Sequence, residues 1–196
     1  MKTKKILIIF GHPSKKTFNR SLMTEYQKGA KEAGHKMDKI DVTDLSLESF
    51  LKNDYRSEVK LSEKLLEAQK KIKWAEHLVF FFPVWWATPP ALLKVFLEVV
   101  LQPKFAYKYK KPLWGFIPRW DKYLKGRTAR IIATMGGPTL YYRHILGEPA
   151  FRMMKASLEF CGIKPIKKNY FGLIELSSKE KRDRWLKKVY RVGLNE

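Results

Sequence analysis

Residues 78–94 read LVFFFPVWWATPPALLK, and this stretch decides the fold class. Its first five residues are apolar at every position, which is typical of a central strand that helices cover on both faces. Pro89 and Pro90 suit the first turn of a helix, and a helical segment over residues 91–101 follows. A buried strand that leads into a helix indicates a parallel sheet of the α/β class.

The rest of the chain repeats this alternation of strand and helix. Short apolar runs predict four more strands, over residues 3–10, 36–45, 127–137 and 163–174. Helical spacing and cap residues predict four more helices, over residues 17–34, 57–76, 148–162 and 177–193. Strands and helices that alternate five times imply a parallel sheet with helices on both faces. Five strands favour the three-layer, flavodoxin-like order 2-1-3-4-5.

Two segments interrupt the alternation. Residues 44–57 form a polar stretch, and residues 102–126 are aromatic and punctuated by Pro and Gly. We expect both to be loops, the second an excursion outside the core. The sequence has no internal repeat, low-complexity tract or linker, so residues 1–196 are expected to form a single domain.

Composition limits the possible partners. The net charge of +21 could serve nucleic acid, an anionic membrane surface or a phosphate-bearing ligand. The lysines are spread over the chain without zinc-ligand spacing or an RNA-binding signature, so we expect no metal and no nucleic-acid partner. No apolar run reaches the ~18 residues that span a bilayer, which argues against an integral membrane protein. The single Cys161 fits a reducing, cytoplasmic compartment and is expected to be a buried apolar residue.

The first candidate ligand-binding loop follows the strand at residues 3–10. In open parallel sheets, ligands bind beyond the carboxyl ends of the strands, at the switch between strands 1 and 3. This loop lacks the dinucleotide and P-loop glycine motifs. If Thr17 caps the next helix, the backbone N–H groups of Phe18 and Asn19 form an anion site to which His12 can donate. The alternative is a capped helix after a turn, with His12 in solvent.

Two further loops should meet the first at the same edge. Adjacent strand residues face opposite sides of a sheet, so Trp85 and Trp86 cannot both be buried in the same way. If the chain turns here, the indoles can border a flat cleft for a planar heteroaromatic ring, although a wall of core aromatics is the alternative. Glycines at 134–138 allow close approach of the backbone, and Tyr141 and Tyr142 could cover the cleft.

Four stretches together resemble the flavodoxin-like NAD(P)H:quinone oxidoreductases of the flavodoxin-2 type. They are GHPSKKTFNRSL (11–22), FFPVWWATPPALLKVFLEVVL (81–101), PKFAY (103–107) and TMGGPTLYYRHILGEPAFRMMKASLEFCGIKP (134–165). The Trp-Trp segment is the more specific part, and the resemblance runs over most of the chain. The family also includes ancillary proteins of potassium-efflux systems. The resemblance implies non-covalent FMN or FAD, NAD(P)H as co-substrate, and a homodimer.

The resemblance also implies a set of site residues. The flavin phosphate would be held by His12, Thr17, Phe18 and Asn19. The isoalloxazine ring would be lined by Pro83, Val84, Trp85 and Trp86, and closed by Thr134, Met135, Gly136 and Gly137. Tyr141 would also contact the cofactor, and Tyr142 is the candidate catalytic residue. Family positions occupied here by Glu98 and Val99 often hold an Asp-Arg pair, and His144 departs from the family spacing, so His144 is expected on the surface.

The sequence therefore predicts an enzyme of the NAD(P)H dehydrogenase (quinone) type. It would pass a hydride from NAD(P)H through the flavin to a quinone or similar small acceptor. The alternative is a flavin-binding regulatory protein that docks peripherally on a membrane potassium-efflux system. Both functions use the same fold, and they differ in whether NAD(P)H is turned over. Residues 105–120 offer apolar surface that a second chain would cover. The short chain shows no evident adenosine site, which favours FMN over FAD.

Overall fold

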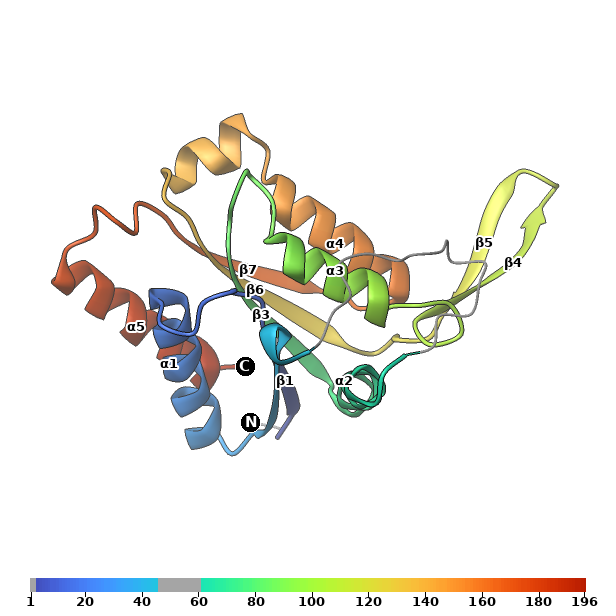
Figure 1. Cartoon of the computed structure of the whole chain (residues 1–196), viewed down its shortest axis with the longest axis horizontal. Helices are drawn as coiled ribbons and strands as arrows, with labels where there is room; N and C mark the ends of the chain where they lie inside the picture. The colour runs from blue at the N-terminus through green and yellow to red at the C-terminus, as the bar shows by residue number, and fades with distance from the viewer. Residues whose placement is uncertain (1–2, 46–60) are drawn as a thin grey trace.

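The computed structural model describes residues 3–45 and 61–196. Most of the loop expected at 44–57 and the first residues of the helix expected at 57–76 lie outside these ranges. One parallel sheet has the order β2-β1-β3-β6-β7 (Figure 1). Its strands are β1 (Lys5–Phe10), β2 (Lys36–Asp41), β3 (His77–Pro83), β6 (Thr128–Thr134) and β7 (Ile166–Phe171). Counted within this sheet alone, the strands follow the predicted order 2-1-3-4-5.

Helices cover both faces of the sheet, as Figure 1 shows. One face carries α1 (Phe18–Glu32) and α5 (Lys179–Leu194), and the other carries α2 (Glu63–Trp74), α3 (Ala91–Val100) and α4 (Pro149–Cys161). Every residue of β3 is buried, as expected for the central strand. Alternate residues of β1 enter different apolar clusters, so Ile8 packs on the α1 side and Ile9 on the α2 side.

Local signals fix several helix ends. The side chains of Thr17 and Ser178 cap α1 and α5, and Gly162 ends α4 with a left-handed φ of 100°. Helices α1 and α5 cross at two glycines: a Cβ atom on Gly29 would lie 2.1 Å from the Tyr190 carbonyl oxygen. This close backbone contact holds α5 against α1.

The expected loop at 102–126 is wrong in part, because it contains an antiparallel hairpin. Strand β4 (Tyr107–Leu113) pairs with β5 (Ile117–Lys122) and projects away from the sheet (Figure 1). Tyrosines and lysines alternate along β4, which is a strand pattern that the prolines obscure. The base of this excursion also enters the core through the buried Phe105 and Leu124.

Two short elements follow sheet strands. Residues Val42–Asp44 form a 3-10 turn that shortens the strand expected at 36–45, and Tyr141–Ile145 form a π-helical turn after β6. Cys161 is buried at the end of α4 as expected, and burial raises its pKa to about 11. Across 3–45 and 61–196, no helix is both long and apolar enough to cross a membrane.

At the edge of the sheet where the strands begin, the side chain of Glu196 is buried between two basic groups. One carboxylate oxygen lies 2.7 Å from Nε of Arg130, and the other lies 3.1 Å from Nε2 of His77. Burial alone would raise the pKa of Glu196, but the hydrogen bonds and charges of His77 and Arg130 outweigh it and hold the pKa at about 2.

Candidate functional site

A cavity of about 200 Å³ opens where strands β1, β3, β6 and β7 end. Ten of its lining residues are among those expected from the sequence: His12, Thr17, Phe18, Asn19, Pro83, Val84, Trp85, Thr134, Met135 and Gly136. Ile174 and Glu175 complete the lining. This cavity, called the cleft below, lies at the β1/β3 switch, where an open parallel sheet binds ligands.

The N-terminus of α1 forms one wall of the cleft. The Thr17 hydroxyl accepts a 3.4 Å hydrogen bond from the Arg20 N–H, which caps the helix as predicted. The N–H groups of Phe18 and Asn19, in the first turn, have no acceptor within the helix. Together with the positive end of the helix dipole, they make this wall suitable for an anion.

His12 lies beside this helix end. Its Nδ1 accepts a 2.9 Å hydrogen bond from the Ser14 N–H, so the neutral ring carries its proton on Nε2. Burial lowers the pKa of His12, which favours that neutral form at pH 7. The ring meets Trp85 edge to face, with 5.5 Å between the centroids. His12 is therefore held as a hydrogen-bond donor rather than as a cation.

Asn19 carries an unsatisfied buried atom. The side chain is 1% exposed, and its Nδ2 donates to Thr134 Oγ1 at 3.1 Å. Its Oδ1 has no hydrogen-bond partner in the described part of the chain. Buried carbonyl oxygens are rarely left unpaired in native proteins, so this oxygen suits a donor supplied by a bound ligand.

The two tryptophans occupy a tight turn. Trp85 and Thr88 exchange two backbone hydrogen bonds of 2.9 Å, and the central residues Trp86 and Ala87 have φ angles of 49° and 62°. Left-handed backbone costs a non-glycine residue about 1–2 kcal/mol, and such strain is concentrated at functional sites. Trp85 is 47% exposed and lines the cleft, whereas Trp86 is 99% exposed. The turn therefore directs Trp86 into solvent, away from the position expected for it.

Backbone groups form the opposite wall. The N–H groups of Val84 and Met135 are already engaged, by the carbonyl oxygens of Thr134 at 2.7 Å and Phe171 at 2.9 Å. In contrast, no backbone carbonyl of the described residues accepts from the N–H of Gly136. A Cβ on Gly136 would meet no atom within 4 Å, so this glycine leaves open space beside a free donor.

The other residues expected at the cleft lie outside its lining. The Tyr142 hydroxyl accepts a 3.0 Å hydrogen bond from the Ala150 N–H, and its ring packs edge to face on Tyr170. Tyr142 is therefore a buried packing residue, because the π-helical turn directs it inward beneath α4, and burial raises its pKa. Tyr141 and Gly137 do not line the cleft either. His144 is exposed, as expected.

Sequence reasoning missed Ile174 and Glu175. They follow β7, and the Ile174 N–H donates to the Met135 carbonyl oxygen at 3.3 Å, which brings this segment to the cleft. The rule that ligands bind beyond the strand ends applies to the fifth strand as well, and could have found them.

Comparison with known proteins agrees with this architecture. A family model described as a flavodoxin-like fold matches residues 4–191. The chain belongs to this family. Its relatives include ribosyldihydronicotinamide dehydrogenase (quinone) of Mus musculus, 26% identical over 93% of this chain and 87% of that protein. The ribosyldihydronicotinamide dehydrogenase-like protein traD of Penicillium crustosum is 29% identical over 70% of this chain, a match that spans 60% of that relative.

Solved structures in the flavodoxin-like fold agree with the family. The crystal structure of Smu.1420 from Streptococcus mutans UA159 has a TM-score of 0.83 and 29% identity, and covers 98% of this chain and 100% of that one. An FMN-dependent NADH-azoreductase from Bacillus anthracis, in complex with FMN, has a TM-score of 0.74 and 19% identity. The match covers 97% of this chain and 98% of that one. The predicted relationship to the NAD(P)H:quinone oxidoreductases is confirmed, and the activities named in these matches agree with the predicted enzyme class.

Proposed function

We propose that the protein is a flavin-dependent NAD(P)H oxidoreductase that reduces a quinone or a similar small acceptor. The observation that carries the proposal is the convergence, in one cleft, of an anion site, an indole wall and a glycine wall with a free N–H. The activity named for the mouse relative, a dehydrogenase with a quinone acceptor, supports the same class of reaction.

The chain's own groups fit such a cofactor. The N–H groups of Phe18 and Asn19 and the Nε2 of His12 would hold its phosphate. The unpaired Oδ1 of Asn19 would accept a hydrogen bond from a sugar-alcohol hydroxyl. Trp85 would border the planar ring on one side, and the backbone at Gly136 would approach it on the other.

A bound flavin would supply the redox chemistry, since it accepts a hydride from reduced nicotinamide and passes reducing equivalents to an acceptor. The protein's part is positioning and electrostatics. The N–H of Gly136 is a preorganised donor for negative charge at a ring edge, and the α1 dipole offsets the phosphate. Trp85 limits water on its side of the cleft. No side chain of the cleft has to act as a nucleophile in this reaction.

We further propose FMN rather than FAD as the cofactor. The cleft provides one anion site, at the start of α1, which suits the single phosphate of FMN better than the diphosphate of FAD. The FMN complex of the Bacillus anthracis azoreductase, which shares this fold, is compatible with that choice. Cofactor released by heating and identified by mass would distinguish the two.

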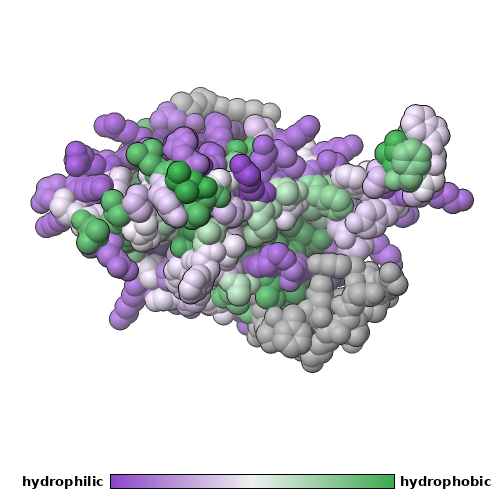
Figure 2. All heavy atoms as spheres, turned by 90° about the horizontal axis from the view of Figure 1, so that it is seen from above, coloured by the Kyte–Doolittle hydropathy of each residue, from purple (hydrophilic) through white to green (hydrophobic). Residues whose placement is uncertain are grey.

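A second copy of the chain is proposed to complete the pocket. About 200 Å³ is below the usual range of about 300–1,000 Å³ for ligand pockets. Figure 2 shows apolar side chains gathered near the tip of the projecting hairpin, where Trp114 is 76% and Phe116 is 75% exposed. Apolar surface of this kind marks an interaction site.

Replacing both hairpin aromatics tests the dimer. The variant Trp114→Ser/Phe116→Ser should give a monomer by sedimentation velocity at a concentration where the unchanged protein is a dimer. A monomeric unchanged protein would contradict the proposed homodimer, as would a variant that dimerises equally well.

Steady-state oxidation of NADH and NADPH in the presence of FMN and benzoquinone tests the activity. We expect turnover that depends on added FMN, and at least tenfold weaker FMN binding in Gly136→Val, which fills the open space beside the ring. The variant should keep its stability, because no protein atom lies within 4 Å of the added Cβ. FMN bound without turnover would contradict the enzyme and favour the regulatory role.

A further inference from the structure

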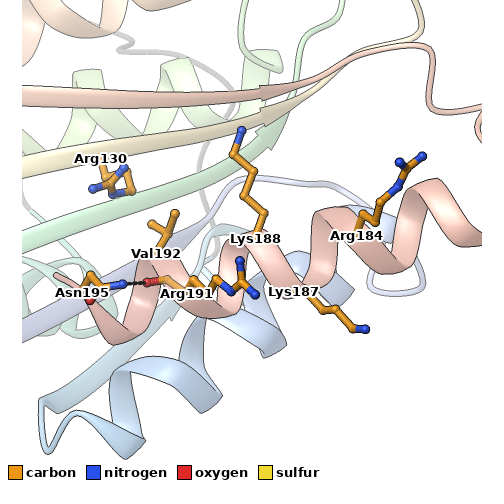
Figure 3. Close-up of a pocket in the computed structure, with 7 residues that line it drawn as sticks. All are labelled: Arg130, Arg184, Lys187, Lys188, Arg191, Val192 and Asn195. Carbon is orange, nitrogen blue, oxygen red and sulfur yellow. Dashed lines mark hydrogen bonds between the residues drawn. The ribbon is translucent and has the colours of Figure 1, made fainter.

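A second hollow, of about 580 Å³, lies between α5 and the strands beside it (Figure 3). It shares no lining residue with the cleft. Four exposed cationic side chains of α5 line it, namely Arg184, Lys187, Lys188 and Arg191. Arg130 of β6 faces them from the sheet. The hollow therefore gathers the charge of several cations around one concave surface.

These four cations form no ion pair within the described part of the chain, and one longer-range attraction acts on them, that of Glu180 for Arg184. Lys15 pairs with Asp44 at 2.8 Å and Lys71 with Asp38 at 3.1 Å, whereas no carboxylate of the described residues forms an ion pair with the four cations of the hollow. Residues 184–195 contain no Asp or Glu. Like charges held close together repel, so the cluster disfavours the folded state unless an anion offsets it.

The helix dipole does not account for the cluster. Cations are stabilised within the last turn of a helix, and the basic residue of the last turn of α5 is Arg191. Arg184 and Lys188 lie one to two turns earlier, where the dipole's effect has decayed. Positions 184, 188 and 191 are spaced i, i+4 and i+7, so they share one helix face over about 10 Å.

The side chains differ in direction. In Figure 3, Lys188 extends from α5 toward the strands, and Val192 points toward Arg130, whereas Lys187 extends to the opposite side. The row formed by Arg184, Lys188 and Arg191 therefore faces the hollow, with Lys187 at its outer rim. A row of this kind can contact several negative charges of one ligand at the same time.

The floor of the hollow contributes little net charge. The guanidinium of Arg130 donates to both carboxylate oxygens of Glu196, at 2.7 and 3.2 Å, and to Asn169 Oδ1 at 2.7 Å. These contacts leave Arg130 neutralised by a buried partner. The attraction for an anion therefore comes from the exposed row on α5, whose side chains can move to fit it.

We propose that this hollow binds a small polyanion that carries two or more linked phosphate groups. Linked phosphates present adjacent negative charges that match the row, whereas a single phosphate reaches only part of it. The concave shape favours a compact ligand over a flat membrane surface. The hollow has no aromatic lining residue, which disfavours single-stranded nucleic acid, since that class of ligand binds by base stacking on aromatic rings.

Calorimetric titration of the full chain with sodium triphosphate, pyrophosphate and orthophosphate tests the proposal. We expect one site, with triphosphate bound at least tenfold more tightly than orthophosphate and more weakly as NaCl screens the charges. Lys188→Gln/Arg191→Gln should weaken triphosphate binding about tenfold. The control Lys31→Gln/Lys36→Gln removes the same net charge from two exposed lysines elsewhere, and should bind as the unchanged protein does.

Three results would overturn the proposal. The first is the absence of triphosphate binding, and the second is an equal loss of binding in both double variants, which would indicate the net charge alone. The third is binding to phosphatidylserine vesicles or a DNA oligonucleotide that depends on Lys188 and Arg191 while triphosphate is not bound. Lys188→Arg retains the charge and should bind triphosphate nearly as well, so misfolding cannot be mistaken for loss of the site.

Discussion

Replacing Asn19 with leucine should have opposite effects on the free protein and on its complex with FMN. In the free protein, Asn19→Leu removes the hydrogen bond to Thr134 and leaves the buried Thr134 hydroxyl without that partner, which costs about 1–3 kcal/mol. It also removes an unpaired buried oxygen, whose burial costs about 1–3 kcal/mol. The two terms offset each other, so the free energy of unfolding should stay within about 1 kcal/mol of the original value or rise.

In the complex, the same substitution removes an acceptor for the ligand. A hydrogen bond of about 1–1.5 kcal/mol corresponds to FMN affinity that is roughly 5- to 13-fold weaker. Urea unfolding without cofactor gives the first quantity, and fluorescence titration of FMN gives the second. Both are measured on the same preparations.

The control Thr134→Val separates the two ends of this contact. It removes the partner of Nδ2 and leaves a buried donor unsatisfied, so the free protein should lose about 1–3 kcal/mol. Its FMN affinity should change less than that of Asn19→Leu. The reasoning is refuted if Asn19→Leu destabilises the free protein as much as Thr134→Val does while FMN affinity is unchanged.

Three further outcomes follow from the fold and the strained turn. Trp86→Gly should raise the free energy of unfolding by about 1 kcal/mol in urea, because glycine adopts the left-handed φ without strain and the indole is in solvent; no gain would contradict the strain. Gly29→Ala should lower it by at least about 2 kcal/mol, because the Cβ would lie 2.1 Å from the Tyr190 carbonyl oxygen, whereas Gly136→Ala should be neutral within about 0.5 kcal/mol; equal effects would contradict the packing. The folded-state pKa of Glu196, about 2, lies below its ordinary 4.5, so its contribution of about 3 kcal/mol is present above pH 4.5 and is lost as the pH falls toward 2. Glu196→Gln should flatten this part of the stability profile, and an unchanged slope would contradict it.

The parts of the fold predicted from the sequence rest on local signals. The continuous apolar run in β3 and the alternation of strands with helices indicate the parallel sheet and favour its order. The caps at Thr17 and Ser178 are short-range hydrogen bonds, which a sequence can show directly. The cleft was found because strand ends in a parallel sheet converge, so the residues that follow β1, β3 and β6 meet without further information.

The residues that the structure places outside the cleft depend on turn geometry and packing that a residue pattern does not show. Trp86 leaves the cleft because a left-handed turn, which usually requires glycine or asparagine, forms here at non-glycine residues. Tyr142 enters the core because its hydroxyl meets the first turn of α4. Neither contact has a short-range signature in the sequence. The hairpin was missed because its prolines read as loop residues.

The central claim is that the cleft binds a flavin, and the absorbance spectrum of the freshly purified protein tests it most directly. Flavin-depleted protein mixed with an equal amount of FMN, followed by removal of small molecules, should remain yellow with one FMN per chain. Gly136→Val and Asn19→Leu should retain less. Protein that stays colourless after incubation with either FMN or FAD would contradict the account.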